Sequence, residues 1–140
     1  TKKEGAKVLC GGQRPAGFNK GYFYEPTIFD NVKDNFKIMT VEPFGPLSPI
    51  TTFKSFDEVI ERANNHSAGL AGYVCTNSMD LANKTSESLE TGMVAVNTPF
   101  LSSAETPFGG IKQSGYGREG GSMGIKDYLN IKYTHLGISN

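Results

Sequence analysis

The amino-acid sequence predicts an α/β fold built around a parallel sheet. Between residues 47 and 97, short apolar runs alternate with stretches whose apolar residues recur at helical spacing. This alternation is typical of strand–helix–strand units, whose strands are parallel and whose connections are right-handed. With 140 residues, 37% of them hydrophobic, the chain is long enough for one globular domain with its own core.

Three extended segments are expected in the first part of the chain. Residues 6–12 (AKVLCGG) are predicted to form a short buried strand that ends at two glycines. Residues 21–32 combine aromatic and β-branched side chains around Pro26. Because proline has no N–H to donate to a ladder, we expect this segment at a sheet edge. Residues 47–53 (LSPITTF) are the next predicted strand.

Two helices and two strands are expected to follow. The first helix covers SFDEVIERANN and begins with a capping box formed by Ser55 and Glu58. Its apolar side chains recur at positions i, i+3, i+4 and i+7, namely Phe56, Val59, Ile60 and Ala63. Residues 70–76 are a predicted apolar strand. Residues 78–90 are a second helix, capped by Ser78 and ended near Gly92, before a buried strand at 93–97.

The last part of the chain is less regular. Residues 98–121 show no periodicity, and a loop of this length in a compact domain is usually functional or mobile. A short helix is expected at 122–129. Beyond it, the sequence alternates, with Leu129, Ile131 and Tyr133 on one face. An unpaired terminal strand of this kind is a template for pairing with another chain.

Gly115, Gly117 and Gly120 form a G-x-G-x-x-G pattern within SGYGREGG. A dinucleotide fingerprint needs a strand directly before its first glycine and an acidic residue about 20 residues after it. Here 17 residues separate the preceding strand from Gly115, and no acid follows Asp127. The pattern therefore predicts a glycine-rich turn that leads into a short helix, with left-handed backbone angles at its glycines.

Composition excludes several classes of function. The chain has 14 basic and 14 acidic residues, so its net charge of zero gives no electrostatic case for nucleic acid or an anionic membrane. No apolar run is long enough to span a bilayer, and no signal peptide is recognised. The sequence does not begin with methionine, from which we expect either a trimmed chain or a piece of a longer protein.

The cysteines and histidines are interpreted as structural. Cys10 and Cys75 lie far apart, outside any C-x-x-C motif, and we expect reduced, buried thiols in a cytoplasmic protein. His66 and His135 stand at no metal-ligand spacing with each other or with the cysteines, so no metal site is predicted. No G-x-S-x-G elbow frames a serine nucleophile.

The segment EPFGPL, residues 42–47, offers the most specific chemistry. A carboxylate, Glu42, stands two residues before an aromatic ring, ahead of a turn with two prolines and a strand. Ligands in open parallel sheets usually bind at the carboxyl ends of strands, whereas this segment enters a strand at its amino end. From the residues alone, a binding site and a stiff connector both stay open.

Six stretches of the chain, in this order and spacing, match one known family. They are GYFYEPTIFDNV, EPFGPLSPITTF, FDEVIERANN, GLAGYVCT, GMVAVN and PFGGIKQSGYGREGG. The chain resembles the C-terminal segment of the NAD(P)-dependent aldehyde dehydrogenases over essentially its whole length. Its ending, GREGGSMGIKDYLNIKY, is most similar to the succinate-semialdehyde dehydrogenase branch.

The resemblance implies a three-layer fold, a parallel sheet with helices on both faces. Residues 1–127 would be the later part of the catalytic domain, and residues 128–140 would hold an oligomerisation strand that joins subunits into a homo-oligomer. In this family the nucleophilic cysteine, the general-base glutamate and most of the NAD(P) site belong to the part of the chain that precedes this segment. We therefore expect no catalytic residue here and no activity from the isolated chain.

The resemblance also assigns four binding residues. Glu42 matches the glutamate that holds the hydroxyls of the nicotinamide-side ribose, and Phe44 matches the aromatic residue beside that ribose. Ser102 falls at a position lining the aldehyde tunnel, where a serine binds the substrate carboxylate in succinate-semialdehyde dehydrogenases. Phe108 matches an aromatic wall of the same pocket. The expected cofactor is NAD or NADP, and the expected substrate is a small aldehyde.

Other interpretations stay open beside this one. Pro99 and Phe100 stand where many succinate-semialdehyde enzymes carry glycine and leucine, so another substrate branch, such as aromatic aldehydes, is an alternative. Ser102 is also compatible with an ordinary loop hydroxyl. A third possibility is a free-standing, non-enzymatic module of the same fold that pairs through its terminal strand.

Overall fold

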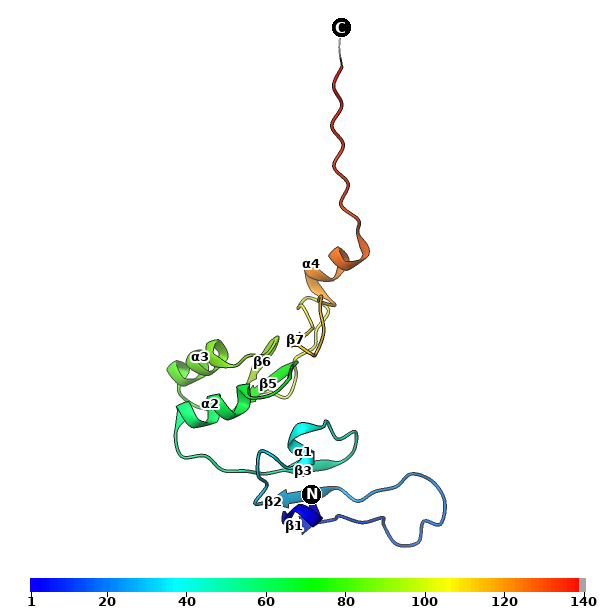
Figure 1. Ribbon diagram of the computed structural model, residues 1–140, viewed down its shortest axis with the longest axis vertical. Coiled ribbons are helices and arrows are strands. Elements are labelled where there is room, and N and C mark those ends of the chain that lie inside the picture. The colour runs from blue at the N-terminus through cyan, green and yellow to red at the C-terminus, as the bar shows by residue number, and fades with distance from the viewer. Residues whose placement is uncertain (139–140) are drawn as a thin grey trace. The chain divides into compact units, whose positions relative to one another are not determined.

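The computed structural model describes residues 1–138, and the chain divides into two compact units (Figure 1). Unit 1 covers Thr1–Arg62, and unit 2 begins at Ala63. Each unit has its own strands and helices, and each is described separately below. No helix among the described residues is long and apolar enough to cross a membrane.

A three-stranded sheet forms the centre of unit 1. Strand β1 (Lys7–Cys10) pairs antiparallel with β2 (Thr27–Asp30), and β2 pairs parallel with β3 (Leu47–Pro49). The segment around Pro26 was predicted at a sheet edge, and this is wrong, because β2 is the central strand. Pro26 lies just before β2, so its missing N–H falls outside the ladder. The first N–H of the strand, that of Thr27, donates to the Pro46 carbonyl at 2.8 Å.

The core of unit 1 lies on one side of β2. Its buried apolar side chains come from β2, from the turn after it and from α1 (Lys37–Thr40), namely Phe29, Val32, Phe36 and Ile38. A short 3-10 turn, η1 (Lys2–Glu4), precedes β1. Strand β1 itself is mostly exposed, so the predicted buried strand at 6–12 is wrong in its burial. The apolar side chains of β1 pack only against the edge of a small core, so much of their surface stays exposed.

Both thiols were predicted to be buried, and this is also wrong. Cys10 and Cys75 are exposed, and neither forms a disulfide. Cys10 is the last residue of β1, and its sulfur lies 3.8 Å from the Pro26 carbonyl oxygen.

Helix α2 (Phe56–Asn64) confirms the predicted amphipathic helix. The Glu58 N–H donates to the Ser55 hydroxyl at 3.2 Å, as the capping box requires. The Glu58 carboxylate accepts from the N–H of Lys54 at 2.9 Å, one residue before the predicted cap. The reciprocal half of the box is thus displaced by one residue, and both bonds still fix the start of the helix.

Unit 2 contains the predicted strand–helix–strand. Strands β5 (Ala71–Val74) and β6 (Met93–Val96) are parallel, with α3 (Met79–Ser88) between them in sequence. The Ser78 hydroxyl caps α3 by accepting from the Leu81 N–H at 3.3 Å. The buried apolar side chains of this unit come from α3 and β6, namely Ala82, Met93 and Ala95. A second pair of strands, β4 (Ala68–Gly69) and β7 (Ile111–Lys112), is antiparallel.

The strands of the described chain belong to three small sheets, of three, two and two strands. Strand β3 pairs with β2, and β5 pairs with β6, so the three-layer parallel sheet expected from the resemblance is not confirmed. The alternation of strand and helix predicted the parallel pairing of β5 with β6. The alternation could not indicate that β3 pairs with β2, which precedes it in the sequence.

The chain after β7 forms short helical turns and an extended tail. Helix α4 (Gly121–Gly124) and the 3-10 turn η2 (Ile125–Tyr128) occupy the region predicted as a short helix. Residues 129–138 are extended, and no strand pairing is seen for them, so the terminal strand is not confirmed. The last two residues of the predicted segment 128–140 lie outside the described residues.

Candidate functional site

The segment that carries Glu42 and Phe44 links α1 to β3. Its turn is closed by the Gly45 N–H, which donates to the Pro43 carbonyl at 2.9 Å, and by the Leu47 N–H, which donates to the Gly45 carbonyl at 2.8 Å. Because β2 and β3 are parallel, the segment lies at the amino ends of both strands. The structure thus holds it in a defined turn against the sheet.

A hollow of about 450 Å³ lies beside this segment, within unit 1. Its apolar wall includes Tyr24, Phe29 and Leu47, and its cationic side chains come from η1 and α1, namely Lys2, Lys3 and Lys37. Glu42 is the single carboxylate among the described residues that line it. An ionised carboxylate only accepts hydrogen bonds, so this hollow can receive a ligand that offers hydroxyl donors beside an apolar face.

Phe44 is not one of the lining residues. Its side chain is 95% exposed, so the ring packs against nothing in the described chain. Large aromatic side chains are seldom left this open, because burying one contributes about 1.5–3 kcal/mol. The position of Phe44 at the tip of a fixed turn suits a ring that packs against a ligand or against another part of the protein.

The loop that carries Ser102 and Phe108 lies in unit 2. Ser102 is exposed, whereas Phe108 is partly buried. The Phe108 N–H donates to the Glu119 carbonyl at 2.7 Å, and the Glu119 N–H donates back at 2.7 Å. Close by, hydrogen bonds from its own backbone N–H and from the Ser103 hydroxyl hold the pKa of the Glu105 carboxyl below its usual value. The loop therefore has local order, although its sequence has no periodicity.

The loop begins at Asn97, where the chain leaves β6. Its side chain bonds both backbone groups of Thr76 at the end of β5, accepting from the N–H at 2.9 Å and donating to the carbonyl at 2.8 Å. Its φ of 57° lies in the left-handed region, which asparagine tolerates better than most residues. A hollow of about 420 Å³ lies at this carboxyl edge and is lined by the turn before α3, by α3 from Met79 to Ser86, and by Val96 and Asn97. The carboxyl edge of parallel strands is the usual place for ligands in such folds.

The four predicted binding residues thus fall into two pairs. Glu42 and Phe44 belong to unit 1, and Ser102 and Phe108 belong to unit 2, so each pair is placed only within its own unit. Among the described residues, no group of three or more His, Cys, Asp or Glu side chains is placed to hold a metal ion.

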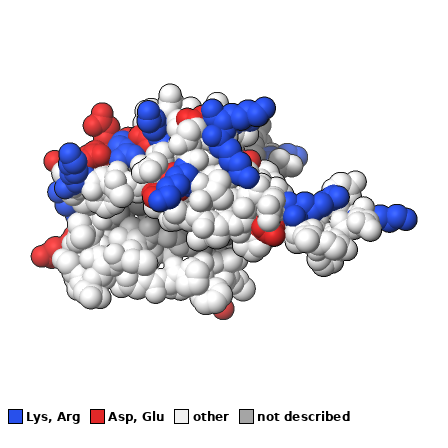
Figure 2. Space-filling view, turned by 90° about the horizontal axis from the view of Figure 1, so that it is seen from below, with Lys and Arg blue, Asp and Glu red and all other residues white. Residues whose placement is uncertain are grey.

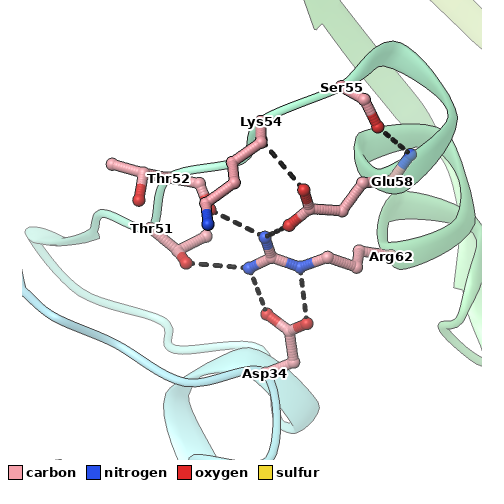
Figure 3. Close-up of polar contacts among 7 residues, drawn as sticks. All are labelled: Asp34, Thr51, Thr52, Lys54, Ser55, Glu58 and Arg62. Atoms are coloured by element: carbon pink, nitrogen blue, oxygen red, sulfur yellow. Dashed lines mark hydrogen bonds and ion pairs between the residues drawn. The ribbon is translucent and has the colours of Figure 1, made fainter.

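A charged cluster in unit 1 was not predicted from the sequence (Figure 3). The Arg62 guanidinium makes a bidentate pair with Asp34, with Nε to Oδ2 at 2.7 Å and Nη2 to Oδ1 at 2.8 Å. It also donates to the Thr52 carbonyl at 2.8 Å, to the Thr51 hydroxyl at 2.8 Å and to Glu58 at 3.0 Å. The Glu58–Arg62 spacing of i, i+4 was a visible signal, but Asp34 lies 28 residues away.

This cluster has a structural role. The hydrogen bonds from Arg62 hold the pKa of the Asp34 carboxyl below its usual value, and the two carboxylates in turn raise the pKa of Arg62. All three groups therefore stay charged near neutral pH and bind the connection between β3 and α2. No hydrogen-bonding group of Arg62 is left to face a ligand, because each of its nitrogens has a partner.

The surface carries much uncovered apolar area. Seven apolar side chains are buried among the described residues, whereas many large ones are exposed, such as Tyr22, Phe100 and Ile131. Figure 2 shows lysine and arginine side chains interspersed with acidic ones, beside a broad area that carries neither. Mixed charges agree with the net charge of zero.

Comparison with known proteins gives consistent results. Aldehyde dehydrogenase 1A1 from Mesocricetus auratus is 51% identical over 138 residues, which cover 99% of this chain and 27% of that relative. The NAD+ complex structure of aldehyde dehydrogenase from Bacillus cereus has a TM-score of 0.89 at 46% identity, over 94% of this chain and 26% of that one. Succinate-semialdehyde dehydrogenase from Burkholderia pseudomallei has a TM-score of 0.88 at 41% identity, over 95% of this chain and 27% of that one.

This chain spans about a quarter of the length of these similar proteins. The model of the aldehyde dehydrogenase family matches residues 1–134, and the solved relatives share the mixed α/β fold described above. The chain therefore belongs to the aldehyde dehydrogenase family.

Proposed function

We propose that this chain supplies the ribose-binding turn, the substrate-side loop and a subunit contact of an NAD(P)-dependent aldehyde dehydrogenase. Such an enzyme oxidises an aldehyde to the carboxylic acid. The observation that carries the proposal is Glu42, a carboxylate on a fixed turn that lines a hollow with an apolar wall. The family match and the NAD+ complex of a similar protein support the same cofactor class.

The residues present fit one end of a dinucleotide. Glu42 would accept hydrogen bonds from two ribose hydroxyls, which is the role that a charged, acceptor-only group performs well. Phe44 would pack its open ring against the same ribose and the ring attached to it. The bound cofactor would supply the hydride acceptor, and this chain would orient it and exclude water from that side.

The substrate side would come from unit 2. We propose succinate semialdehyde, or a similar semialdehyde, as the substrate, with the Ser102 hydroxyl donating to its distal carboxylate and Phe108 forming an apolar wall. The similarity to a succinate-semialdehyde dehydrogenase structure supports this branch. Phe100, with its exposed ring, favours an aromatic aldehyde as the alternative. Neither Cys10 nor Cys75 is proposed as the nucleophile.

The arrangement of the chain is proposed on the same grounds. Residues 1–127 would be part of the catalytic domain, and residues 128–140 would join subunits. The extended backbone of 129–138 and the exposed side chains of Leu129, Ile131 and Tyr133 support a subunit contact. Two exposed thiols without a disulfide support a reducing, cytoplasmic location.

Glu42→Gln tests the cofactor role in the natural protein that contains these residues. The amide keeps the size and one acceptor but loses the charge, and a hydrogen bond to a charged group contributes about 1.5–3 kcal/mol. Hydride transfer should slow by roughly tenfold or more, because about 1.4 kcal/mol corresponds to tenfold in rate. A primary deuterium isotope effect on the aldehyde hydrogen should appear or grow.

The matched control is Glu61→Gln, which removes an exposed carboxylate on α2 and should leave turnover unchanged. If Glu42→Gln also leaves turnover and the isotope effect unchanged, residues 42–47 are only a connector.

The proposed subunit contact has its own test. Replacing Ile131 by Asp in the natural protein should lower the mass measured by light scattering, because a charge would be buried in the contact. Thr134→Asp places the same charge on the other face of the alternating segment and should leave the mass unchanged. A free-standing module that pairs through this segment would respond in the same way but would show no aldehyde oxidation.

A further inference from the structure

The glycine-rich stretch SGYGREGG has no part in the function proposed above. Its glycines adopt left-handed backbone angles, with φ of 109° at Gly115, 78° at Gly117 and 69° at Gly120. We propose that residues 117–121, the glycine clamp, position the substrate-side loop and so determine which aldehyde the site accepts. This inference rests on the proposed function and names a further specificity-determining element of the same site.

The clamp binds the loop through its backbone. Glu119 exchanges two hydrogen bonds of 2.7 Å with Phe108, and the Gly121 N–H donates to the Ala104 carbonyl at 2.9 Å. Residues 104–108 are therefore tied to the clamp at both ends of a five-residue stretch. Ser102 lies two residues before this stretch, and Phe108 closes it.

Gly120 brings the two strands of this contact together. A Cβ on Gly120 would lie 2.6 Å from the Thr106 carbonyl oxygen, which belongs to the backbone and cannot rotate away. Non-bonded carbon and oxygen atoms need about 3.5 Å, so the loop would have to move by about 1 Å to admit one methyl group. Only glycine allows the approach that the structure shows.

Arg118 secures the far end of the loop. Its Nη1 donates to the Gly110 carbonyl at 2.8 Å and to the Gly117 carbonyl at 2.7 Å, and its own N–H donates to Asp127 at 3.1 Å. The guanidinium thus spans from the clamp to the segment that follows Phe108. With this bond, the clamp contacts the loop at three places: before Phe108, at Phe108 itself and after it.

The clamp would determine substrate specificity by fixing the position of the substrate-side loop. A displacement of about 1 Å in a positioning element can change a rate by up to about a hundredfold. The displacement would change the rate for an aldehyde whose far end contacts Ser102 and Phe108. It would change the rate for an aldehyde of another shape by a different factor. The hydrogen bonds of the clamp described above are made to residues of the loop and to Asp127, and none of them is made to Glu42 or Phe44, so KM for the cofactor is the internal control.

Gly120→Ala in the natural protein is the test, with two measurements. The first is hydrogen exchange at the Phe108 and Gly121 amides, which should become at least tenfold faster. The second is the ratio of kcat/KM for succinate semialdehyde to kcat/KM for benzaldehyde, which should change by about tenfold or more, while KM for the cofactor stays within twofold.

Gly115→Ala is the matched control. It makes the same substitution at a positive φ in the same stretch, but its Cβ would meet no atom within 4 Å. We expect the exchange rates and the kcat/KM ratio of this variant to equal those of the wild type. If Gly115→Ala changes the ratio as much as Gly120→Ala does, backbone strain explains the effect and the clamp is refuted.

Arg118 provides a second variant in case Gly120→Ala does not fold. Arg118→Met removes the donors and should shift the kcat/KM ratio in the same sense, and Arg118→Lys should restore part of it. Unchanged exchange in both Gly120→Ala and Arg118→Met would overturn the clamp. Faster exchange with an unchanged kcat/KM ratio would overturn its role in specificity.

The proposed function can be refuted without refuting the clamp. If the wild-type protein oxidises no aldehyde with NAD+ or NADP+, the function is refuted, and the exchange rates alone then decide whether residues 117–121 hold the loop. Faster exchange in Gly120→Ala would still support the clamp in that case.

Discussion

Two irregular connections of this chain are held in place by opposite means. In unit 1, the segment between β3 and α2 is bound by the charged side chain of Arg62, which contacts Asp34, Glu58 and two threonines (Figure 3). In unit 2, the loop after β6 is bound mainly by backbone hydrogen bonds and by glycines that let two segments approach closely, and Arg118 adds one side-chain hydrogen bond to it. The first connection depends mainly on one charged side chain, and the second depends mainly on close backbone approach at glycines.

The difference determines what each connection tolerates. Exposed ion pairs typically contribute only about 0.2–1 kcal/mol, and salt and pH weaken them. Close backbone packing is insensitive to salt, but one added methyl group forces the chain apart. We therefore expect solvent conditions to loosen the connection in unit 1 and small substitutions to damage the loop in unit 2.

The largest effect is expected at Gly92, where the loop crosses the start of β6. A Cβ on Gly92 would lie 2.0 Å from the Gly109 carbonyl oxygen and 2.8 Å from the Gly110 Cα. Overpacking of this kind typically costs about 1–3 kcal/mol and sometimes more. Gly92→Ala should therefore lower the melting temperature of the natural protein by several degrees.

Gly45→Ala is the control for this substitution. Gly45, like Gly92, has no left-handed φ, and its Cβ would meet no atom within 4 Å. Its melting temperature should equal that of the wild type. Equal melting temperatures for all three proteins would show that the loop does not press on β6.

Arg62→Met should have an intermediate effect, confined to unit 1. Methionine keeps most of the length and apolar stem but removes all five hydrogen bonds of the guanidinium. Asp34 has a side chain 49% exposed, so water resolvates it and the loss of stability stays limited. Hydrogen exchange at the Glu58 amide should accelerate, and exchange at the Phe108 amide should not.

Arg14→Met is the matched control, because Arg14 is exposed and its guanidinium, among residues 1–138, donates only to the Gly21 carbonyl, at 2.6 Å. It should change the exchange rate at Glu58 by less than twofold. If Arg62→Met also leaves that rate unchanged, the cluster contributes nothing to the connection.

A smaller effect is expected at Ser78, a side-chain contact within unit 2. Its hydroxyl accepts the Leu81 N–H at 3.3 Å, and loss of a helix cap typically costs about 1 kcal/mol. Ser78→Ala should accelerate exchange at the Leu81 amide about fivefold. Ser86→Ala, at an exposed position of the same helix, should leave it unchanged or slow it, because alanine favours helix. Equal rates in both variants would mean that the cap is not formed in solution.

Local patterns in the sequence were sufficient for part of this fold. The spacing of apolar residues predicted α2 and α3, and the caps at Ser55 and Ser78 were confirmed. The glycine-rich turn was confirmed too, because the positive φ values fall on the glycines of the G-x-G-x-x-G pattern. These features depend on residues within a few positions of one another, where the sequence is most informative.

Long-range features were not predictable in the same way. Nothing near Asp34 indicates that Arg62 is its partner, and nothing near Pro26 indicates that β2 is flanked on both sides. Burial of Cys10 and Cys75 was inferred from apolar neighbours, but an apolar neighbour is covered only if another segment lies over it. For the binding residues, the resemblance assigned Glu42 a role in cofactor binding, and only the structure shows that it lines a hollow. The contacts that hold Phe108 come from Glu119, eleven residues further along the chain.

The smallest effect expected is an acid dependence that belongs to unit 1. Hydrogen bonds from Arg62 hold the pKa of Asp34 below the 3.8 of a free aspartate. Because the pKa is lower in the folded state, the stabilisation is fully present above the unfolded pKa and is lost as pH falls through the folded one. For a pair this exposed it should amount to less than about 1 kcal/mol.

Acidification from pH 6 to pH 3 should therefore raise the opening equilibrium around the Glu58 amide more in the wild type than in Asp34→Asn, once exchange rates are corrected for intrinsic pH dependence. The backbone pair between Phe108 and Glu119 contains no titrating group, so the opening equilibrium there should change less over the same range. If Asp34→Asn shows the same acid dependence as the wild type, another carboxylate, such as Glu58, is responsible. Should Phe108 respond as strongly as Glu58, the two connections would not differ in the way that their contacts imply.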